Sequence, residues 1–311
     1  MLRTMKPHHT VLAGYGWMSL AVFIWASWLV LTSSGRVTAL SVVDLAGFRA
    51  MIPAIVLAPL LWRHREHVAR LGLRRCLLLS AYGAPFTLCV GYGLSFAPVA
   101  HAGAMVPGLM PVFAIGLGAT FFGQRVCRRD GIVCLFILSG AGTIVWHTSG
   151  ASEGETVWIG HVLFLAGALF WACFTVTVAQ SDVRPFLATA IVAVLPVLLL
   201  APAWAFLDAS RIGTAEPSDI MFQAVFQGVV SDLVSLFSFG RALQLIGGRA
   251  ATLSALAPGV ATLLAIPTLG ETPQGVELAA LMLVVLGHFV RAMGATRTST
   301  QADHQTSRGR G

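Results

Sequence analysis

The sequence predicts an all-α polytopic membrane protein with ten transmembrane helices, arranged as two inverted repeats of five helices each (5+5). Three observations predict this fold: the composition, the number of long apolar segments, and a repeat that relates the two halves of the chain. Of the 311 residues, 56% are hydrophobic and only 11% are charged, whereas soluble domains carry about a quarter charged residues. A chain of this composition is expected to lie in a bilayer.

A helix crosses a hydrocarbon core of about 30 Å with roughly 20 residues. Ten apolar segments approach that length, at residues 12–31, 43–62, 76–95, 100–121, 131–147, 158–179, 186–207, 222–244, 250–270 and 276–293. Five fall in each half of the chain. The first segment has the length of a full span, and its FIWASW sequence recurs in the second half, so we interpret it as a helix and not as a signal peptide.

The repeat is clearest where the fourth and ninth segments end. Residues 111–124, PVFAIGLGATFFGQ, align without gaps with residues 258–271, PGVATLLAIPTLGE, at an offset of 147. The same offset pairs Asp130 with Glu277 and Gly140 with Gly287, and nearby offsets pair FIWASW with LFWACF. Duplicated halves that each contain several spans are typical of secondary transporters.

An odd number of spans in each repeat means that the second copy enters the membrane from the opposite side. The expected organisation is a cytoplasmic N-terminus (1–10), a first repeat (11–148), an external linker (149–157), a second repeat (158–294) and a disordered cytoplasmic tail (295–311). With both termini inside, 17 of the 20 lysines and arginines lie on the cytoplasmic side, as the positive-inside rule requires. We therefore expect a multi-pass protein of a bacterial-type inner membrane, and the basic charge indicates lipid contact and not nucleic-acid binding.

Three motifs carry a resemblance to a known family. They are APGVATLLAIPTLGE at 257–271, the Phe48–Arg49 pair in the second segment, and the WAS and WAC runs in the first and sixth segments. With these motifs the chain resembles the EamA-type transporters of the drug/metabolite transporter superfamily over nearly its whole length. The resemblance implies a cavity built from helices one to four and six to nine, with helices five and ten peripheral, so that the protein is a monomer or a homodimer through those two helices. At Gln124 the chain departs from the glutamate that usually ends the first repeat.

Asp232 is the residue whose position most strongly indicates function. A carboxylate at mid-membrane depth costs about 2.5–3.5 kcal/mol, so it needs a partner or a wet cavity. Gln223, Gln227, Ser231 and Ser235 recur every four residues and place a polar stripe beside it. Asp232 is therefore a candidate for solute binding and for proton coupling, with Gln227, Ser231 and Ser235 as further solute-binding candidates. The alternative is a static pair with an arginine that fastens two helices together.

Arg49 lies well inside the second segment and keeps its charge at any physiological pH. It could bind a carboxylate or phosphate of the solute, or it could play a structural role by reaching the interface or capping exposed carbonyls. Four aromatic residues complete the solute-binding candidates, because their rings could stack on a planar or apolar part of a solute: Trp25, Trp171, Tyr82 and Tyr92. Trp25 and Trp171 are related by the repeat and are expected near the axis between the two halves.

Gln124 and Glu271 end the fourth and ninth segments, and we interpret both as structural residues at helix ends. Glu271 is expected to need a compensating donor, because a negative charge opposes the dipole at a helix C-terminus. We interpret His64 and His67, in a basic loop, as solvated residues, and His101 lies at the start of the fourth segment. The five cysteines show no metal-ligand spacing, so we expect no metal and no cofactor.

These observations favour a secondary transporter or facilitator that moves a small organic metabolite or drug-like solute by alternating access, as an exporter, with lipids and the solute as its partners. No phosphate-binding loop of the GxxxxGK[ST] type is present in the sequence. One alternative is a membrane sensor or scaffold that transports nothing. The other is an intramembrane lipid-modifying enzyme, which would need a convergent catalytic set that the sequence does not show.

Overall fold

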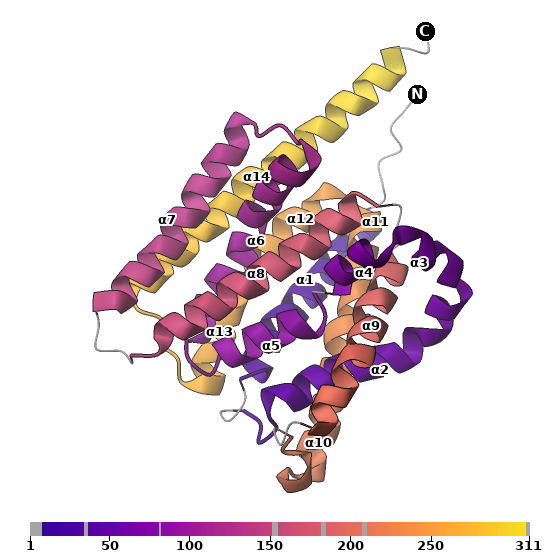
Figure 1. Ribbon diagram of the computed structural model, residues 1–311. Helices are drawn as coiled ribbons and strands as arrows, with labels where there is room; N and C mark the ends of the chain where they lie inside the picture. Colours follow the sequence, from indigo (N-terminus) through magenta and orange to yellow (C-terminus); the bar gives the residue numbers. More distant parts are fainter. Residues whose placement is uncertain are drawn as a thin grey trace.

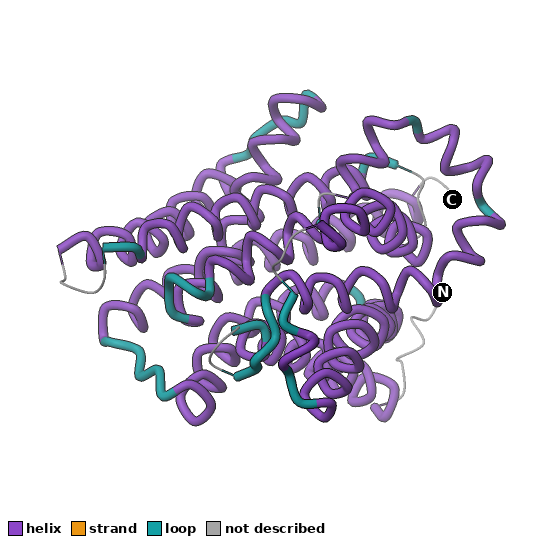
Figure 2. Tube along the Cα trace, turned by 60° about the horizontal axis from the view of Figure 1, so that its bottom comes forward, coloured by secondary structure: helices purple, strands orange, loops and turns teal. Residues whose placement is uncertain are grey.

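The computed structural model describes the backbone of residues 8–33, 37–80, 82–150, 155–181, 185–206 and 210–308. Helices make up nearly all of these residues, and the described part of the chain contains no strand (Figures 1 and 2). Parts of the expected cytoplasmic N-terminus (1–7) and of the expected external linker (151–154) lie outside the described residues.

The first half of the chain forms seven helices. They are α1 (His8–Leu31), α2 (Val42–Arg63), α3 (Arg65–Leu71), α4 (Leu73–Ser80), α5 (Ala84–Gly93), α6 (Val99–Phe122) and α7 (Arg128–Gly150). The turn between α4 and α5 divides the third predicted segment, where Gly83 packs so closely on Val192 and Pro196 that a Cβ would lie 2.5 Å from the Val192 carbonyl oxygen. Apolar composition does not report such a break, because both sides of it are apolar.

The second half is also helical, but its later helices are interrupted more often. The elements are α8 (Val157–Ala179), α9 (Pro185–Phe206), η1 (Ile212–Thr214), α10 (Pro217–Gln223), η2 (Ala224–Val234), α11 (Ser235–Ile246), α12 (Gly248–Leu253), η3 (Ser254–Leu256), α13 (Ala257–Leu269) and α14 (Gly275–Arg308). The η2 element is a π-helix of 11 residues that runs directly between α10 and α11. π-helical turns are rare in proteins, but those that occur are often at functional sites. The π-helix η2 contains Asp232.

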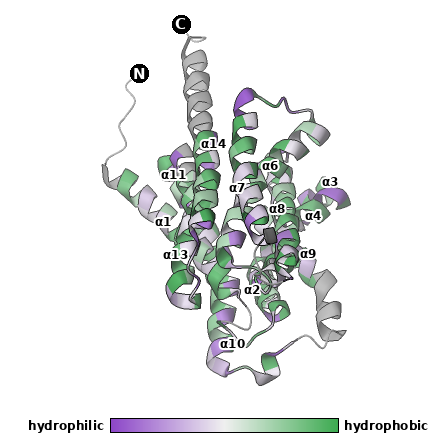
Figure 3. Cartoon of the chain, turned by 90° about the vertical axis from the view of Figure 1, so that its left-hand side faces the viewer, coloured by the Kyte–Doolittle hydropathy of each residue, from purple (hydrophilic) through white to green (hydrophobic). Residues whose placement is uncertain are grey.

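Each of the ten predicted segments overlaps one helix or a series of consecutive helices. In the described residues, seven helical stretches are long and apolar enough to cross a membrane, and two shorter apolar helices lie at Leu187–Val197 and Ser254–Leu269. Figure 3 shows the hydrophobic colouring along the bundle, with hydrophilic colouring at α3. Large apolar side chains such as Trp146, Ile55 and Leu135 are exposed on the outside of the bundle, where lipid would cover them.

α7 and α14, which correspond to each other in the repeat, pack side by side (Figure 1). A Cβ on Gly140 would lie 2.6 Å from the Ala280 carbonyl oxygen and 2.9 Å from Val284, and a Cβ on Gly287 would lie 2.7 Å from Ile137. Gly140 and Gly287 are one repeat pair, and Ile137 and Val284 are another. Such reciprocal contacts are what a twofold axis produces. The residue numbers rise along one helix as they fall along the other, so the two copies run antiparallel.

The other contacts between helices are reciprocal in the same way. The first helix of each repeat packs against the third and fourth segments of the other repeat: α1 contacts α11 and α13, and α8 contacts α5 and α6. The core therefore lies between the repeats, and most of its largest cluster of buried side chains comes from α1, α5, α6, α7 and α8.

The ends of α6 and α13 share one geometry. Gly123 and Gly270 both follow the last helical residue with left-handed backbone angles, at φ values of +62° and +70°. The next residue in each case donates its backbone N–H to a carbonyl six positions earlier, from Gln124 to Gly118 at 3.0 Å and from Glu271 to Ala265 at 3.4 Å. Glycine adopts these angles without strain, which explains why the LG and FG steps recur at the offset of 147.

α14 continues to Arg308, past the predicted end near residue 293 and across most of the segment 295–311 for which the sequence predicted disorder. No glycine or proline occurs between Ala295 and Arg308, so nothing in the local sequence interrupts the helical hydrogen bonding. Residues 309–311 lie outside the described part of the chain.

Candidate functional site

Arg49 on α2 and Asp232 on η2 form an ion pair that joins the two repeats. The Arg49 Nη2 and Asp232 Oδ1 atoms are 2.7 Å apart, and the side chains are only 9% and 20% exposed. The other terminal nitrogen of Arg49, Nη1, donates to the Ser231 hydroxyl at 2.8 Å. The guanidinium thus binds two neighbouring residues of the polar stripe, and the charge of Asp232 is matched by a single arginine.

Aromatic rings from α1, from α8 and from the turn between α4 and α5 surround this pair. The Arg49 guanidinium lies 4.6 Å from the centre of the Trp28 ring, a geometry that favours a cation–π interaction. Tyr82 interacts with the Arg49 guanidinium through its side chain, and it stacks on Phe174 with ring centroids 4.7 Å apart. Trp171 lies beside Tyr82, at 6.0 Å between centroids. The charged pair is therefore bounded by flat apolar surfaces.

Two buried polar atoms in this region have no hydrogen-bond partner within the described residues. They are Nε1 of Trp28, which is a donor, and Oε1 of Gln227, which is an acceptor. Buried polar groups are normally hydrogen-bonded, so an unpartnered one needs an explanation. Both residues lie next to the Arg49–Asp232 region, Trp28 through its ring and Gln227 one helical turn from Ser231. They are groups to which a polar solute could bind.

Further polar contacts join the two repeats. They lie between the Arg49–Asp232 pair and the end of the bundle where α2 begins. Gln223 Nε2 donates to the Leu31 carbonyl at 3.2 Å, and Gln227 Nε2 donates to the Thr32 hydroxyl at 3.3 Å. Asp44, fully buried, accepts hydrogen bonds from the Ser210 hydroxyl and the Arg211 backbone N–H at 2.6 and 2.8 Å. These links close that end of the bundle.

Asp219 adds a further link of the same kind. Its Oδ2 atom accepts hydrogen bonds from the Thr38 hydroxyl at 2.7 Å and from the Ala39 backbone N–H at 3.1 Å. The segment before α2 is thereby held to the first turn of α10. Sequence analysis did not identify Asp44 or Asp219, because a polar residue at a helix end normally serves as a cap, and Asp44 does form a capping box with Ser41.

The candidates named from the sequence fall into several groups. Arg49, Asp232, Ser231 and Tyr82 come together, with Trp171 adjacent. Ser235 donates back to the Ser231 carbonyl of its own helix, and Gln227 faces Thr32. Trp25 packs on Phe239, so it lies in the contact between α1 and α11 that corresponds to the contact of Trp171 with the other repeat. Tyr92 is 41% exposed, and none of its described contacts reaches the ion pair.

The two helix-end residues differ in what their side chains contact. The Glu271 carboxylate accepts the backbone N–H of Val99, the first residue of α6, at 2.8 Å. A compensating donor thus comes from the N-terminus of a helix in the other repeat, where a negative charge is favourable. The Gln124 side chain lies over Gly118 of its own helix.

A second polar cluster lies at the end of the bundle where α6, α8 and α14 begin. His101 Nε2 and Glu277 Oε1 are 2.6 Å apart, and His161 Nε2 lies 3.1 Å from His101 Nδ1. Both histidines are buried, with His101 only 1% exposed. No role was assigned to His101 from the sequence, and the structure shows that α8 and α14 cover it and supply its partners.

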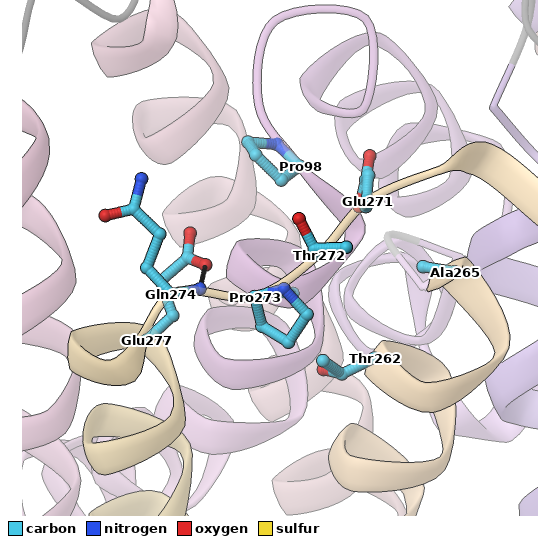
Figure 4. A pocket seen from close by; sticks show the side chains of 9 residues that line it. Pro98, Thr262, Ala265, Glu271, Thr272, Pro273, Gln274 and Glu277 are labelled. Atoms are coloured by element: carbon cyan, nitrogen blue, oxygen red, sulfur yellow. Dashed lines mark hydrogen bonds between the residues drawn. The ribbon is translucent and has the colours of Figure 1, made fainter. Parts of the chain in front are cut away.

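A pocket of about 160 Å³ lies next to this second cluster (Figure 4). Pro98, Glu271, Pro273, Gln274 and Glu277 are among the residues that line it. The described residues include no group of three His, Cys, Asp or Glu side chains placed to hold a metal ion.

The repeated apolar helices, the exchange of contacts between the repeats and a charged pair between them define a membrane transporter. The chain belongs to the EamA-like transporter family, whose profile matches it twice, at residues 12–146 and 158–292. The two matches confirm the duplication, and the family consists of transporters and not of enzymes.

Two curated relatives are exporters. A probable amino-acid metabolite efflux pump of Salmonella typhimurium is 27% identical over 244 residues, which cover 68% of this chain and 78% of the relative. The pseudopaline exporter CntI of Pseudomonas aeruginosa is 26% identical over 141 residues, 45% of this chain and 48% of that protein. A solved crystal structure covers 94% of this chain and 99% of its own, with a TM-score of 0.57 and 20% identity, and it shows the fold alone.

Proposed function

We propose that this protein is a secondary transporter that exports a small zwitterionic metabolite of the amino-acid class, with the Arg49–Asp232 pair at the centre of its solute site. The main observation behind this proposal is that two opposite charges, Arg49 from the first repeat and Asp232 from the second, lie 2.7 Å apart within the bundle. The name of the Salmonella relative supports the substrate class, and both relatives support export.

The charge of the site favours a zwitterion over an ion. The pair is neutral as it stands, and a buried charge without a counter-charge costs several kcal/mol. A solute with one carboxylate and one ammonium group can replace the internal pair with two ion pairs, its carboxylate at Arg49 and its ammonium at Asp232. A solute with only one of these groups would leave one protein charge uncompensated.

The surroundings of the pair suit the rest of such a solute. Trp28 Nε1 and Gln227 Oε1 offer one free donor and one free acceptor, and the rings of Tyr82 and Trp171 offer a surface for an apolar side chain. Flat apolar surfaces beside a small number of polar groups are typical of small-molecule sites.

Alternating access follows from the inverted arrangement of the repeats. We infer from the antiparallel packing of α7 and α14 that the second repeat enters the membrane from the opposite side, with ten spans and both termini in the cytoplasm. In that orientation the links of Asp44, Asp219, Gln223 and Gln227 close the outer side of the site. Export requires these links to break while equivalent contacts form on the inner side.

A proton gradient can drive the cycle through Asp232. The Asp232 carboxylate can release Arg49 only if a proton or another cation takes the place of the arginine. A proton that binds Asp232 would therefore make Arg49 available to the solute. In this arrangement the same residue binds the solute and the proton, in alternation.

The test is counterflow of radiolabelled amino acids into proteoliposomes that contain the purified protein. Transported amino acids should lose transport when presented as the amide, which lacks the carboxylate, or as the decarboxylated amine. Asp232→Asn and Arg49→Lys should each reduce transport by at least about tenfold, since each loses a charge-assisted contact worth more than 1.4 kcal/mol. Glu216→Gln and Arg211→Lys are matched controls, because both residues are exposed at one end of the bundle.

Transport that is unchanged in the Asp232 and Arg49 variants would refute this site. A protein that binds no amino acid and moves none would favour the sensor or scaffold reading instead.

A further inference from the structure

We propose that Glu277, His101 and His161 form a second proton-binding site, which holds one exchangeable proton and locks the two repeats together where α6, α8 and α14 begin. The three side chains form a continuous chain of hydrogen bonds. Glu277 Oε1 lies 2.6 Å from His101 Nε2, and His101 Nδ1 lies 3.1 Å from His161 Nε2. Both ring nitrogens of His101 are therefore engaged.

The geometry limits the number of protons that the chain can hold. When His101 is neutral, its Nε2–H donates to Glu277 and its Nδ1 accepts a hydrogen bond from His161. When His101 is charged, both of its nitrogens donate, and His161 must be the neutral acceptor. The two histidines cannot both be charged, because two donors would then face each other across 3.1 Å. The cluster thus carries a net charge of minus one, or zero after it takes up one proton.

Burial makes the proton-loaded state the favourable one. His101 is 1% exposed, His161 is 5% exposed and Glu277 is 12% exposed, and a buried carboxylate without a counter-charge is costly. One proton on His101 converts the contact with Glu277 into a charge-assisted hydrogen bond, which is roughly twice as strong as a neutral one. The proton therefore strengthens the bond.

The pocket gives the proton a route to the cluster. Glu277 lines the pocket of about 160 Å³, together with Glu271 and Gln274 (Figure 4). The backbone N–H of Gln274 donates to the second oxygen of Glu277 at 2.7 Å, which holds that carboxylate at the pocket wall. A proton can enter from the pocket at Glu277 and move inward along the histidines.

Titratable groups face the cluster from several neighbouring elements. α6 contributes His101, α8 contributes His161, α14 contributes Glu277 and the loop before α14 contributes Glu271. From α7, His147 acts on Glu277 electrostatically and binds Gln274 Oε1 at 2.9 Å. His147 lies at the edge of this series of hydrogen bonds, and none of the described contacts joins it to His101.

The cluster joins the first repeat to the second, and loss of its hydrogen bonds would release the two repeats from each other. His101 belongs to the first repeat, and His161 and Glu277 belong to the second. Glu271 also reaches across, to the backbone N–H of Val99. Movement of one repeat against the other at this end must break these contacts, so proton occupancy sets how readily this end opens.

The test is hydrogen–deuterium exchange of the full-length protein in lipid nanodiscs, between about pH 5.5 and pH 8, the range in which a histidine titrates. Peptides that cover residues 97–103 and 270–278 are compared after correction for the intrinsic exchange rate. This readout needs no solute, so its failure is distinct from failure of the proposed transport function. In the wild type, we expect exchange to become roughly fivefold faster at the high-pH end, in a one-proton transition.

Glu277→Gln, His101→Gln and His161→Gln should each abolish the transition, whereas His147→Gln should retain it. Melting temperatures of the same variants, measured at one pH, separate loss of the transition from loss of folding. A wild type whose corrected exchange is independent of pH, or a folded Glu277→Gln variant that keeps the transition, would overturn the proposal.

Discussion

Asp232 and Arg49 each carry a charge that a membrane interior opposes, and each neutralises the other at 2.7 Å. Their proximity does not by itself separate a transport role from a static one, since a pair that fastens two helices would have the same geometry. What separates them is the environment: the pair joins the two repeats, its Asp232 lies on a π-helix, and it is next to two buried polar atoms that have no partner among the described residues.

Removal of one partner of the pair should destabilise the protein more than removal of both. Asp232→Asn leaves the Arg49 charge buried and unpaired, which we expect to lower the free energy of unfolding by about 3–5 kcal/mol. The double variant Arg49→Met with Asp232→Leu replaces both charges with apolar groups, and should lie closer to the wild type. Unfolding of detergent-solubilised protein, followed by thermal or denaturant titration, checks this expectation. A double variant whose loss equals the sum of the two single losses would contradict the pairing.

The sequence identified Asp232 and Arg49 separately but could not show that they meet. Their spacing along the chain carries no information about contact, because the contact depends on how the second repeat packs on the first. The polar stripe was visible as a period of four residues, yet the structure assigns its members to different partners: Ser231 to Arg49, Gln227 to Thr32 and Ser235 to its own backbone.

At the scale of elements, the close approach of α7 and α14 depends on small residues. Gly140 and Gly142 lie two positions apart on α7, but only Gly140 faces α14. A Cβ on Gly140 would meet the Ala280 carbonyl oxygen and Val284, whereas nothing lies within 4 Å of a Cβ on Gly142. The spacing of the glycines in the sequence does not show which of the two makes the contact.

These two glycines therefore predict opposite effects for one substitution. Gly140→Ala should destabilise the protein by about 1–3 kcal/mol, because an added methyl group forces the helices apart. Gly142→Ala should be neutral or stabilising by up to about 1 kcal/mol, because alanine favours the helix. Melting of both variants in the same detergent checks the difference. Equal effects of the two substitutions would show that α7 does not pack on α14 through Gly140.

The breaks within the third and eighth predicted segments were not visible in the sequence. Hydropathy reports how apolar a stretch is, and it does not distinguish an α-helix from a π-helix or from two helices joined by a turn. The turn at Gly83 and the π-helix η2 both lie at close tertiary contacts, of Gly83 with Val192 and of Gly228 with Ile52. Both breaks lie near the Arg49–Asp232 pair in the fold.

At the scale of the whole molecule, duplication explains most of what could be predicted. Apolar length and a repeat offset suffice to predict helices, their approximate ends and a two-repeat architecture, because these features depend on local composition. The exchange of contacts between α7 and α14 then follows from a twofold relation. The buried His101 cluster could not be predicted in this way, because it depends on how α6, α8 and α14 pack against one another.

The proposed orientation predicts which loops an impermeant reagent can reach. Glu216→Cys, in the loop before α10, should react with a membrane-impermeant maleimide on intact cells. Arg125→Cys, in the loop before α7, should react only after the membrane is permeabilised, because the basic loops face the cytoplasm. Both positions are exposed. Labelling of Arg125→Cys on intact cells would reverse the orientation.

Alternating access to one site between the repeats is the central claim, and substituted-cysteine accessibility at Ser235 tests it most directly. Ser235 lies one helical turn beyond Ser231 and is buried, and the five native cysteines would first be replaced by alanine. In proteoliposomes, Ser235→Cys should react with a small impermeant reagent from either face, at rates that change in opposite directions when an outward or inward proton gradient is imposed, and a transported amino acid should protect it. Reaction from one face only, whatever the gradient or solute, would contradict the account.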